Sequence, residues 1–200
     1  ETKKGTDNGT ENLPANIDAQ YNVGFSWLRL PAIRFQQKVG GITTLALSLE
    51  NAQITGFDKG GANAPTNYFF GGTGNNGGLY NNTTTYTNNV APDFVVKAAF
   101  DPAFGHFEVG GALRFMRDRY YPNETSTPAS SAGATNNTKL AGGVFANARV
   151  KATNYVTIGL HFLGGDGVGR YGTAGLADAT IHPDGTLEPL HAYQGLFSLE

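Results

Sequence analysis

Residues 94–116 decide the fold, and they read Phe94-Val95-Val96-Lys97-Ala98-Ala99-Phe100, then Asp101-Pro102-Ala103-Phe104-Gly105, then His106-Phe107-Glu108-Val109-Gly110-Gly111-Ala112-Leu113-Arg114-Phe115-Met116. Two segments of alternating apolar residues thus flank a short stretch that contains proline and glycine. Because successive side chains of a strand point to opposite faces, each segment has one apolar face and one face that includes charge. The pattern predicts an antiparallel β-hairpin.

Five further segments alternate in the same way, so the sequence predicts seven strands. They cover residues 22–38, 41–51, 91–100, 106–118, 139–151, 155–163 and 190–200, and a polar loop at 1–21 precedes them. The side chains expected on the apolar face include Leu45, Leu47, Phe94, Val96, Val109, Leu113, Val144, Val150, Val156 and Leu160. A soluble β-sandwich also alternates, so this pattern alone does not identify the environment.

The lengths of the connections indicate a membrane barrel. Short turns near 39–41, 101–105 and 152–154 alternate strictly with long connections at 52–90, 119–138 and 164–189. Loops beyond about 12–15 residues are uncommon in compact domains. Outer-membrane barrels have short periplasmic turns and long extracellular loops. The sequence therefore predicts an all-β fold, an antiparallel up-and-down transmembrane β-barrel in the lipid of a bacterial outer membrane.

Composition argues against several other classes of protein. The net charge is −2 and the sequence pI is near 6.1, which argues against a nucleic-acid partner. Cysteine is absent, so there is no disulfide framework and no thiolate site. No run of about 18 apolar residues occurs, which excludes a transmembrane helix.

Motifs of enzymes and cofactor sites are also missing or out of context. Residues 72–77 match G-x-G-x-x-G by letter, but they lie in an Asn/Gly-rich loop with no apolar strand before them and no helix after them. The sequence has no G-x-S-x-G and no H-E-x-x-H. His106 and Glu108 have a spacing compatible with two metal ligands, but no third ligand is near. We therefore expect no enzyme, no cofactor and no metal site.

The number of predicted strands leads to an expectation about the chain itself. Seven is odd, whereas bacterial single-chain barrels have an even number of strands, and an open edge in lipid leaves backbone groups unpaired. The last segment, 193–200, stops within a strand without a turn. We therefore expect residues 1–200 to be a single β-barrel domain truncated at both ends.

The hairpin near the N-terminus has a family resemblance. Residues 23–35 read VGFSWLRLPAIRF and residues 40–51 read GGITTLALSLEN. This resembles the hairpin of DcaP-like porins, in which an aromatic-rich strand with an Arg, a Pro and an Ile-Arg-aromatic step precedes a leucine-alternating strand that ends in Glu-Asn. Residues 110–114 and 191–193 are similar in kind. The resemblance implies a trimeric outer-membrane porin for the passive diffusion of small anions such as dicarboxylates.

Basic residues fall on the polar faces of three predicted strands, and they are Lys97, Arg114, Arg149 and Lys151. A cation facing hydrocarbon costs about 2–4 kcal/mol at the midplane, so we predict that these side chains line the lumen. Arg34 joins them if its neighbours Ile33 and Phe35 face lipid. Arg29 lies an odd number of residues before Arg34, so simple alternation places it on the opposite face. It reaches the lumen only if a bulge near Pro31 resets the register or if it lies above the membrane.

Two acids, Glu50 and Glu108, fall on the same faces as the cations. Rings of Arg and Lys favour anions in a pore. Alternatively, the cations only cross-link the barrel wall with these acids. The porin function has its own alternatives, which are an adhesin that uses its Asn/Thr-rich loops, a structural barrel, or a soluble β-sandwich.

Overall fold

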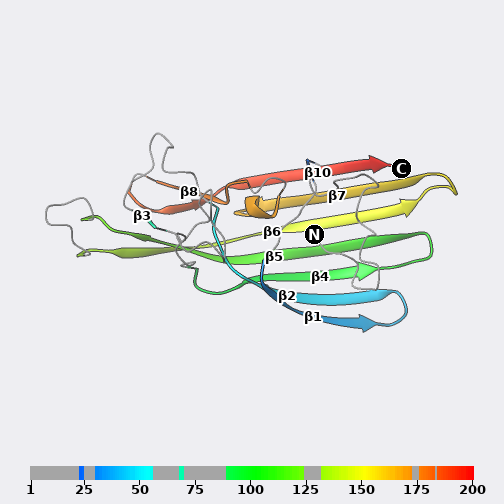
Figure 1. Cartoon of the computed structure of the whole chain (residues 1–200), viewed down its shortest axis with the longest axis horizontal. Coiled ribbons are helices and arrows are strands. Elements are labelled where there is room, and N and C mark those ends of the chain that lie inside the picture. Colours follow the sequence, from blue (N-terminus) through cyan, green and yellow to red (C-terminus); the bar gives the residue numbers. More distant parts are fainter. Residues whose placement is uncertain are drawn as a thin grey trace.

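The computed structural model describes residues 23–24, 30–55, 68–69, 89–123, 132–172, 176–182 and 184–200. Its main feature is one antiparallel sheet with the strand order β1-β2-β4-β5-β6-β7-β10 (Figure 1). These strands are β1 (Ala32–Val39), β2 (Thr43–Glu50), β4 (Asp93–Phe100), β5 (Gly105–Tyr120), β6 (Thr135–Lys151), β7 (Thr157–Asp166) and β10 (His191–Leu199). A short strand β3 (Tyr68–Phe69) pairs with β5, and β8 (Ala179–Ile181) pairs with β9 (Leu187–Pro189).

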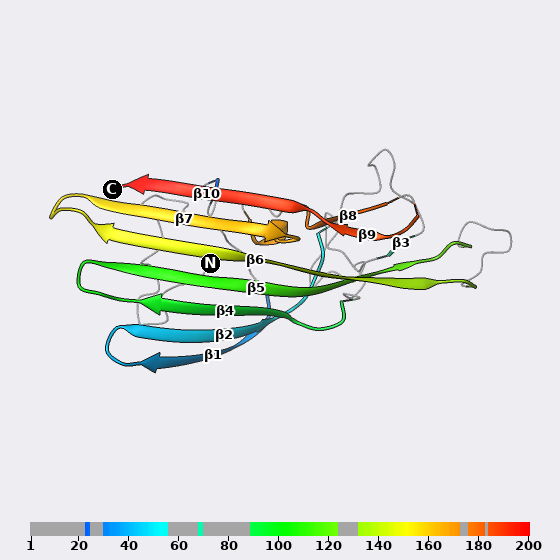
Figure 2. The ribbon, with the colours of Figure 1, turned by 180° about the vertical axis from the view of Figure 1, so that it is seen from behind.

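The sheet is an up-and-down meander. Each long strand pairs with the next one along the chain, and β1 and β10 form the two edges, so the sheet is not closed. The short turns β1–β2, β4–β5 and β6–β7 lie together at one end, which we call the turn end (Figure 2). The long connections lie at the other end, the loop end. The predicted topology and the predicted sorting of the connections are both confirmed.

The strand boundaries differ from the prediction in two ways. The first strand begins at Ala32 instead of residue 22, directly after Pro31, which has no N–H to donate to a sheet. Residues 25–29 lie outside the described residues. Strands β5 and β6 extend further than predicted, so the connection predicted at 119–138 shortens to 121–134.

The other two predicted long loops are not free of structure. The connection at 52–90 contains β3, and the connection at 164–189 contains a 3₁₀ helix, η2 (Gly169–Tyr171), and the β8–β9 hairpin. Strands of two or three residues are too short for a period-2 pattern to reveal them. No helix in the described part of the chain is long and apolar enough to cross a membrane.

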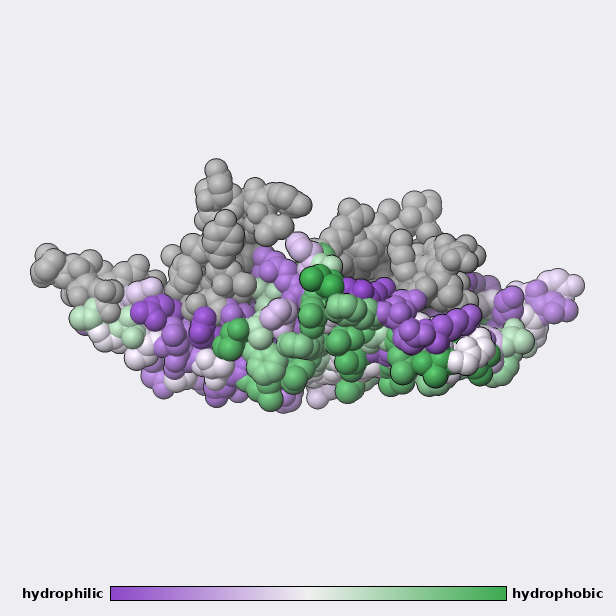
Figure 3. All heavy atoms as spheres, turned by 90° about the horizontal axis from the view of Figure 1, so that it is seen from below, coloured by the Kyte–Doolittle hydropathy of each residue, from purple (hydrophilic) through white to green (hydrophobic). Residues whose placement is uncertain are grey.

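Strand register assigns every side chain to one of two faces, because Cα partners on adjacent strands share a face. We call the face that carries Leu47, Val96 and Val144 the outer face. All ten residues predicted for the apolar face are exposed or partly exposed, and none is buried. Figure 3 views the sheet from its β1 edge, where hydrophobic residues gather over the middle of the strands and hydrophilic ones toward both ends. This is the pattern of a lipid-facing band.

The buried apolar residues lie on the opposite face, which we call the inner face. There a second layer of the structure packs against β5 and β6. We call it the inner layer, and it consists of residues 51–55, 167–172, 176–182 and 184–190. Its contacts form the apolar cluster Ile54, Met116, Ala141, Ala179, Ile181 and Leu187. The side chains of the outer face do not converge into this core. The alternative of a soluble β-sandwich is therefore wrong for this chain.

Candidate functional site: the charged inner face

The inner face holds every sequence-predicted site residue that the structure describes. Arg34 is the Cα partner of Ser48, Lys97 of Gly110, Arg114 of Ala141, Arg149 of Gly159 and Lys151 of Thr157, and the register also places Glu50 and Glu108 on this face. Arg29 lies outside the described residues. The assignment of charge to one face follows from the period of the strand.

A cluster of charged and polar side chains crosses four strands in the turn-end half of the inner face. Lys97 of β4 forms a buried ion pair with Glu108 of β5. Glu108 also accepts a hydrogen bond of 3.0 Å from Nδ2 of Asn147 on β6, and Oδ1 of Asn147 lies 3.2 Å from Nδ1 of His161 on β7. Charge-assisted and cross-strand contacts of this kind brace a sheet. The cluster fits the bracing interpretation of Lys97.

Three further contacts between charged or titratable side chains lie nearer the turns. Nδ1 of His106 is 2.6 Å from Oδ1 of Asp101 in the β4–β5 turn, and Nε2 of His106 is 3.3 Å from Oε1 of Glu108. Nη2 of Arg149 is 2.5 Å from Oε2 of Glu200. Within the described residues, no group of three or more His, Cys, Asp or Glu side chains is arranged to hold a metal.

Arg114 forms the centre of a second cluster, near the loop end. Its side chain is fully buried, with Nε 2.9 Å from Oδ2 of Asp93 and Nη1 2.9 Å from Oδ1 of Asp178. Its guanidinium also donates to the carbonyl oxygens of Gly167 and Gln53. Arg114 therefore occupies the predicted face but is not exposed to solvent, because the inner layer covers it.

Arg170 and Tyr171 of the inner layer complete this cluster. The backbone N–H of Arg170 donates to Oδ1 of Asp178 over 2.7 Å, and its Nη1 donates to the Gln53 carbonyl over 2.7 Å. The Tyr171 hydroxyl lies 3.0 Å from Glu50 and 3.1 Å from Asp93. Burial raises the pKa of Tyr171 far above its ordinary value, so it stays a neutral donor to these carboxylates.

Lys139 on β6 is exposed and lies 3.9 Å from Oε2 of Glu188. Three further cations of the inner face are exposed: Arg34 and Lys38 on β1, and Lys151 at the end of β6. None of them forms an ion pair with another residue of the described part of the chain. They differ from Lys97 and Arg114, whose charges are neutralised by adjacent carboxylates. These exposed cations are the ones that solvent and a passing ion can reach.

Sequence reasoning missed four members of the Arg114 cluster, namely Asp93, Arg170, Tyr171 and Asp178. Asp93 is the first residue of β4, so its place on the inner face could have been read from the alternation that placed Lys97. The other three lie in a connection without periodicity. No local pattern reveals that this connection folds back on the wall.

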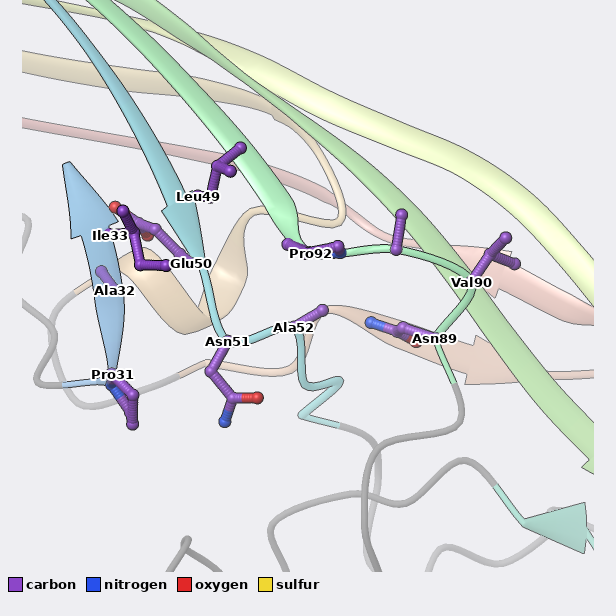
Figure 4. Close-up of a pocket in the computed structure, with 11 residues that line it drawn as sticks. Pro31, Ala32, Ile33, Leu49, Glu50, Asn51, Ala52, Asn89, Val90 and Pro92 are labelled. Atoms are coloured by element: carbon purple, nitrogen blue, oxygen red, sulfur yellow. The ribbon is translucent and has the colours of Figure 1, made fainter. Parts of the chain in front are cut away.

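A cavity of about 540 Å³ opens at the loop end of β1, β2 and β4 (Figure 4). Its lining is mostly apolar, and it includes Ile33, Leu49, Val90 and Pro92, with Glu50 as its charged member. Such a lining offers few groups to recognise a hydrophilic solute. The charged inner face is therefore the better candidate for the functional site.

Comparison with solved structures finds a protein with a similar fold. The outer membrane channel DcaP of Acinetobacter baumannii has a similar structure, with a TM-score of 0.63 at 14% sequence identity. The match covers 94% of this chain and 44% of the channel. No family model matches the sequence, and no curated protein matches it either. The likeness shows that this chain has the DcaP-like porin fold.

Proposed function

We propose that this chain, whose fold is that of an outer-membrane channel, forms wall strands of a porin in the bacterial outer membrane. Small hydrophilic solutes would diffuse passively through its water-filled lumen. The observation that carries the proposal is the sorting of one meander into an apolar outer face and a charged inner face. Only a barrel with lipid outside and water inside gives both faces a suitable solvent.

The balance of charge supports a preference for anions. Among the described strands, seven basic residues lie on the inner face, and they are Arg34, Lys38, Lys97, Arg114, Lys139, Arg149 and Lys151. Four acidic residues of these strands share that face, and they are Glu50, Asp93, Glu108 and Asp118. Three further acids outside these strands, Asp178, Glu188 and Glu200, pair with Arg114, Lys139 and Arg149 and reduce the excess of positive charge. The excess of positive charge would attract anions into the lumen. Because Lys97 and Arg114 are paired and buried, we expect the exposed Arg34 and Lys151 to contribute most to the anion preference.

A homotrimer, and dicarboxylate-like anions as solutes, also belong to the proposal. Both rest on the resemblance of residues 23–51 to the hairpin of DcaP-like porins. Outer-membrane lipid would contact the outer face. The channel fold supports transport as the function of this chain, and we expect no catalysis.

Neutralising the two exposed cations tests the anion preference. We expect the double variant Arg34→Gln/Lys151→Gln to lower the anion-to-cation permeability ratio of the intact channel, measured from the reversal potential in a salt gradient. The expected decrease is roughly twofold at low salt and smaller at high salt, because ions screen the potential.

The control removes the same charge from the outer face, where Arg117 and Arg119 lie beyond the apolar band. Arg117→Gln/Arg119→Gln should leave the ratio close to that of the wild-type channel. A ratio that is unchanged in Arg34→Gln/Lys151→Gln, or that falls equally in both double variants, would mean that these inner-face cations do not select anions.

A further inference from the structure

The inner layer covers the loop end of the inner face, and a simple open pore does not require such a layer. It lies on the extended part of the β5–β6 hairpin, where its apolar side chains contact Met116 and Ala141. Nδ2 of Asn137 donates to the Gly185 carbonyl over 2.8 Å. The ring of Tyr120 lies so close to Gly185 that a Cβ there would be 2.7 Å from it. The layer is thus packed against the wall.

Arg114 is the main polar connection between the wall and this layer. Of the four residues that form ion pairs or hydrogen bonds with its guanidinium, Asp93 belongs to the wall, whereas Gln53, Gly167 and Asp178 belong to the inner layer. A planar guanidinium suits this arrangement because it presents several donors in fixed directions. Loss of such a buried cation leaves carboxylates without compensation, which is strongly destabilising.

The opposite side of the inner layer faces away from the wall. Ala179, Ile181 and Leu187 are buried against the sheet, whereas the alternate residues Thr180, His182 and Glu188 are partly or largely exposed. Oε2 of Glu188 lies 3.9 Å from Nζ of Lys139 on β6, so this side chain lies at the border between the layer and the wall. Nε2 of His182 lies 3.7 Å from Oε2 of Glu188, and both side chains are about half exposed. In a barrel, the side of the layer that faces away from the wall leads into the lumen.

We propose that the inner layer is a fixed constriction of the pore and that Arg114 is the positioning residue that holds it against the wall. The inference rests on the porin function proposed above. Solutes would then pass His182 and Glu188, while Arg114 acts through the layer that it fastens. The apolar cluster and the Arg114 cluster together keep the layer in place.

Cysteine labelling tests the role of Arg114, because the chain has no cysteine of its own. Ala179 of the inner layer is fully buried between the layer and the wall, so in Ala179→Cys the thiol should react slowly with a hydrophilic maleimide. Adding Arg114→Met should speed the labelling roughly tenfold or more, because local opening becomes easier. Adding Asp178→Asn, which changes the layer and leaves the wall intact, should act in the same direction.

The matched control is Lys97→Met, since Lys97 is also a buried, paired cation of the inner face but contacts Glu108 of the wall. It should leave the labelling rate of Ala179→Cys unchanged. An exposed thiol in Asn154→Cys, in the β6–β7 turn, should react equally fast in every background and so show that the substitutions do not change the reactivity of the reagent itself. If Arg114→Met and Lys97→Met give equal rates at Ala179→Cys, Arg114 does not position the layer.

Conductance tests the constriction itself. A bulky maleimide attached to Glu188→Cys should lower the single-channel conductance of the intact channel, whereas the same reagent on Asn154→Cys should not. An unchanged conductance after complete labelling of Glu188→Cys would place the layer outside the ion path and overturn the proposal. If the wild-type protein forms no channel at all, the porin function fails instead, and the labelling of Ala179→Cys still tests whether Arg114 holds the layer.

Discussion

Gly110 shows how single residues adapt the sheet to its inner side chains. It lies on the inner face of β5, opposite its Cα partner Phe145 in β6. A Cβ at this position would be 2.3 Å from the Phe145 ring and 2.3 Å from the carbonyl oxygen of Val96. The ring could rotate, but the carbonyl belongs to the hydrogen-bonded backbone of β4. Covering a strand glycine with an aromatic ring stabilises a sheet.

We therefore expect Gly110→Ala to lower the free energy of unfolding by about 1–3 kcal/mol through overpacking. Gly41→Ala is the control, because a Cβ at Gly41 meets no atom within 4 Å. Urea unfolding of the protein in lipid vesicles measures both. Equal unfolding midpoints for the two variants would contradict the close packing at Gly110.

At the scale of the element, the sequence predicts which face of a strand a side chain lies on better than it predicts where the strand begins and ends. Period-2 alternation placed Lys97, Glu108 and Arg149 correctly on one face, because the parity of a strand is a local property. The extension of β5 and β6 past residues 118 and 139 was not predictable in this way. The extended part of this hairpin contacts residues of the β8–β9 hairpin, which come from a distant part of the chain.

The outer face of β6 gives a test of the lipid-facing band. Val144 is 60% exposed and aligns with Val96 and Leu47 across the middle of the sheet. We expect Val144→Arg to destabilise the protein in a bilayer by about 2–4 kcal/mol, because a cation would face hydrocarbon near the midplane. Reversible unfolding from lipid vesicles measures the change.

Val39→Arg is the matched control for depth. Val39 also lies on the outer face, but it ends β1 beside the short turn. Near the membrane interface the cost of a cation should fall to about 0–1 kcal/mol. Similar costs at both positions would show that the outer face is not embedded across its middle.

At the scale of the whole molecule, the candidate site was only partly predictable. Arg114 and Lys97 look alike in the sequence, since each is a single cation within an alternating strand. The structure separates them because the connection after β7 returns to the wall and brings Asp178 and the Gly167 carbonyl to Arg114. A connection without periodicity carries no signal of where it packs. The resulting molecule is one antiparallel sheet with a second layer on its inner face.

The central claim is that this wall encloses water. The most direct measurement is the current across a planar lipid bilayer after addition of the intact, purified protein. We expect discrete steps of conductance, with a current that rises almost linearly with voltage, as passive diffusion through a water-filled pore requires. A protein that inserts stably into the bilayer and yet produces no steps would contradict the porin function and favour a structural or adhesive barrel.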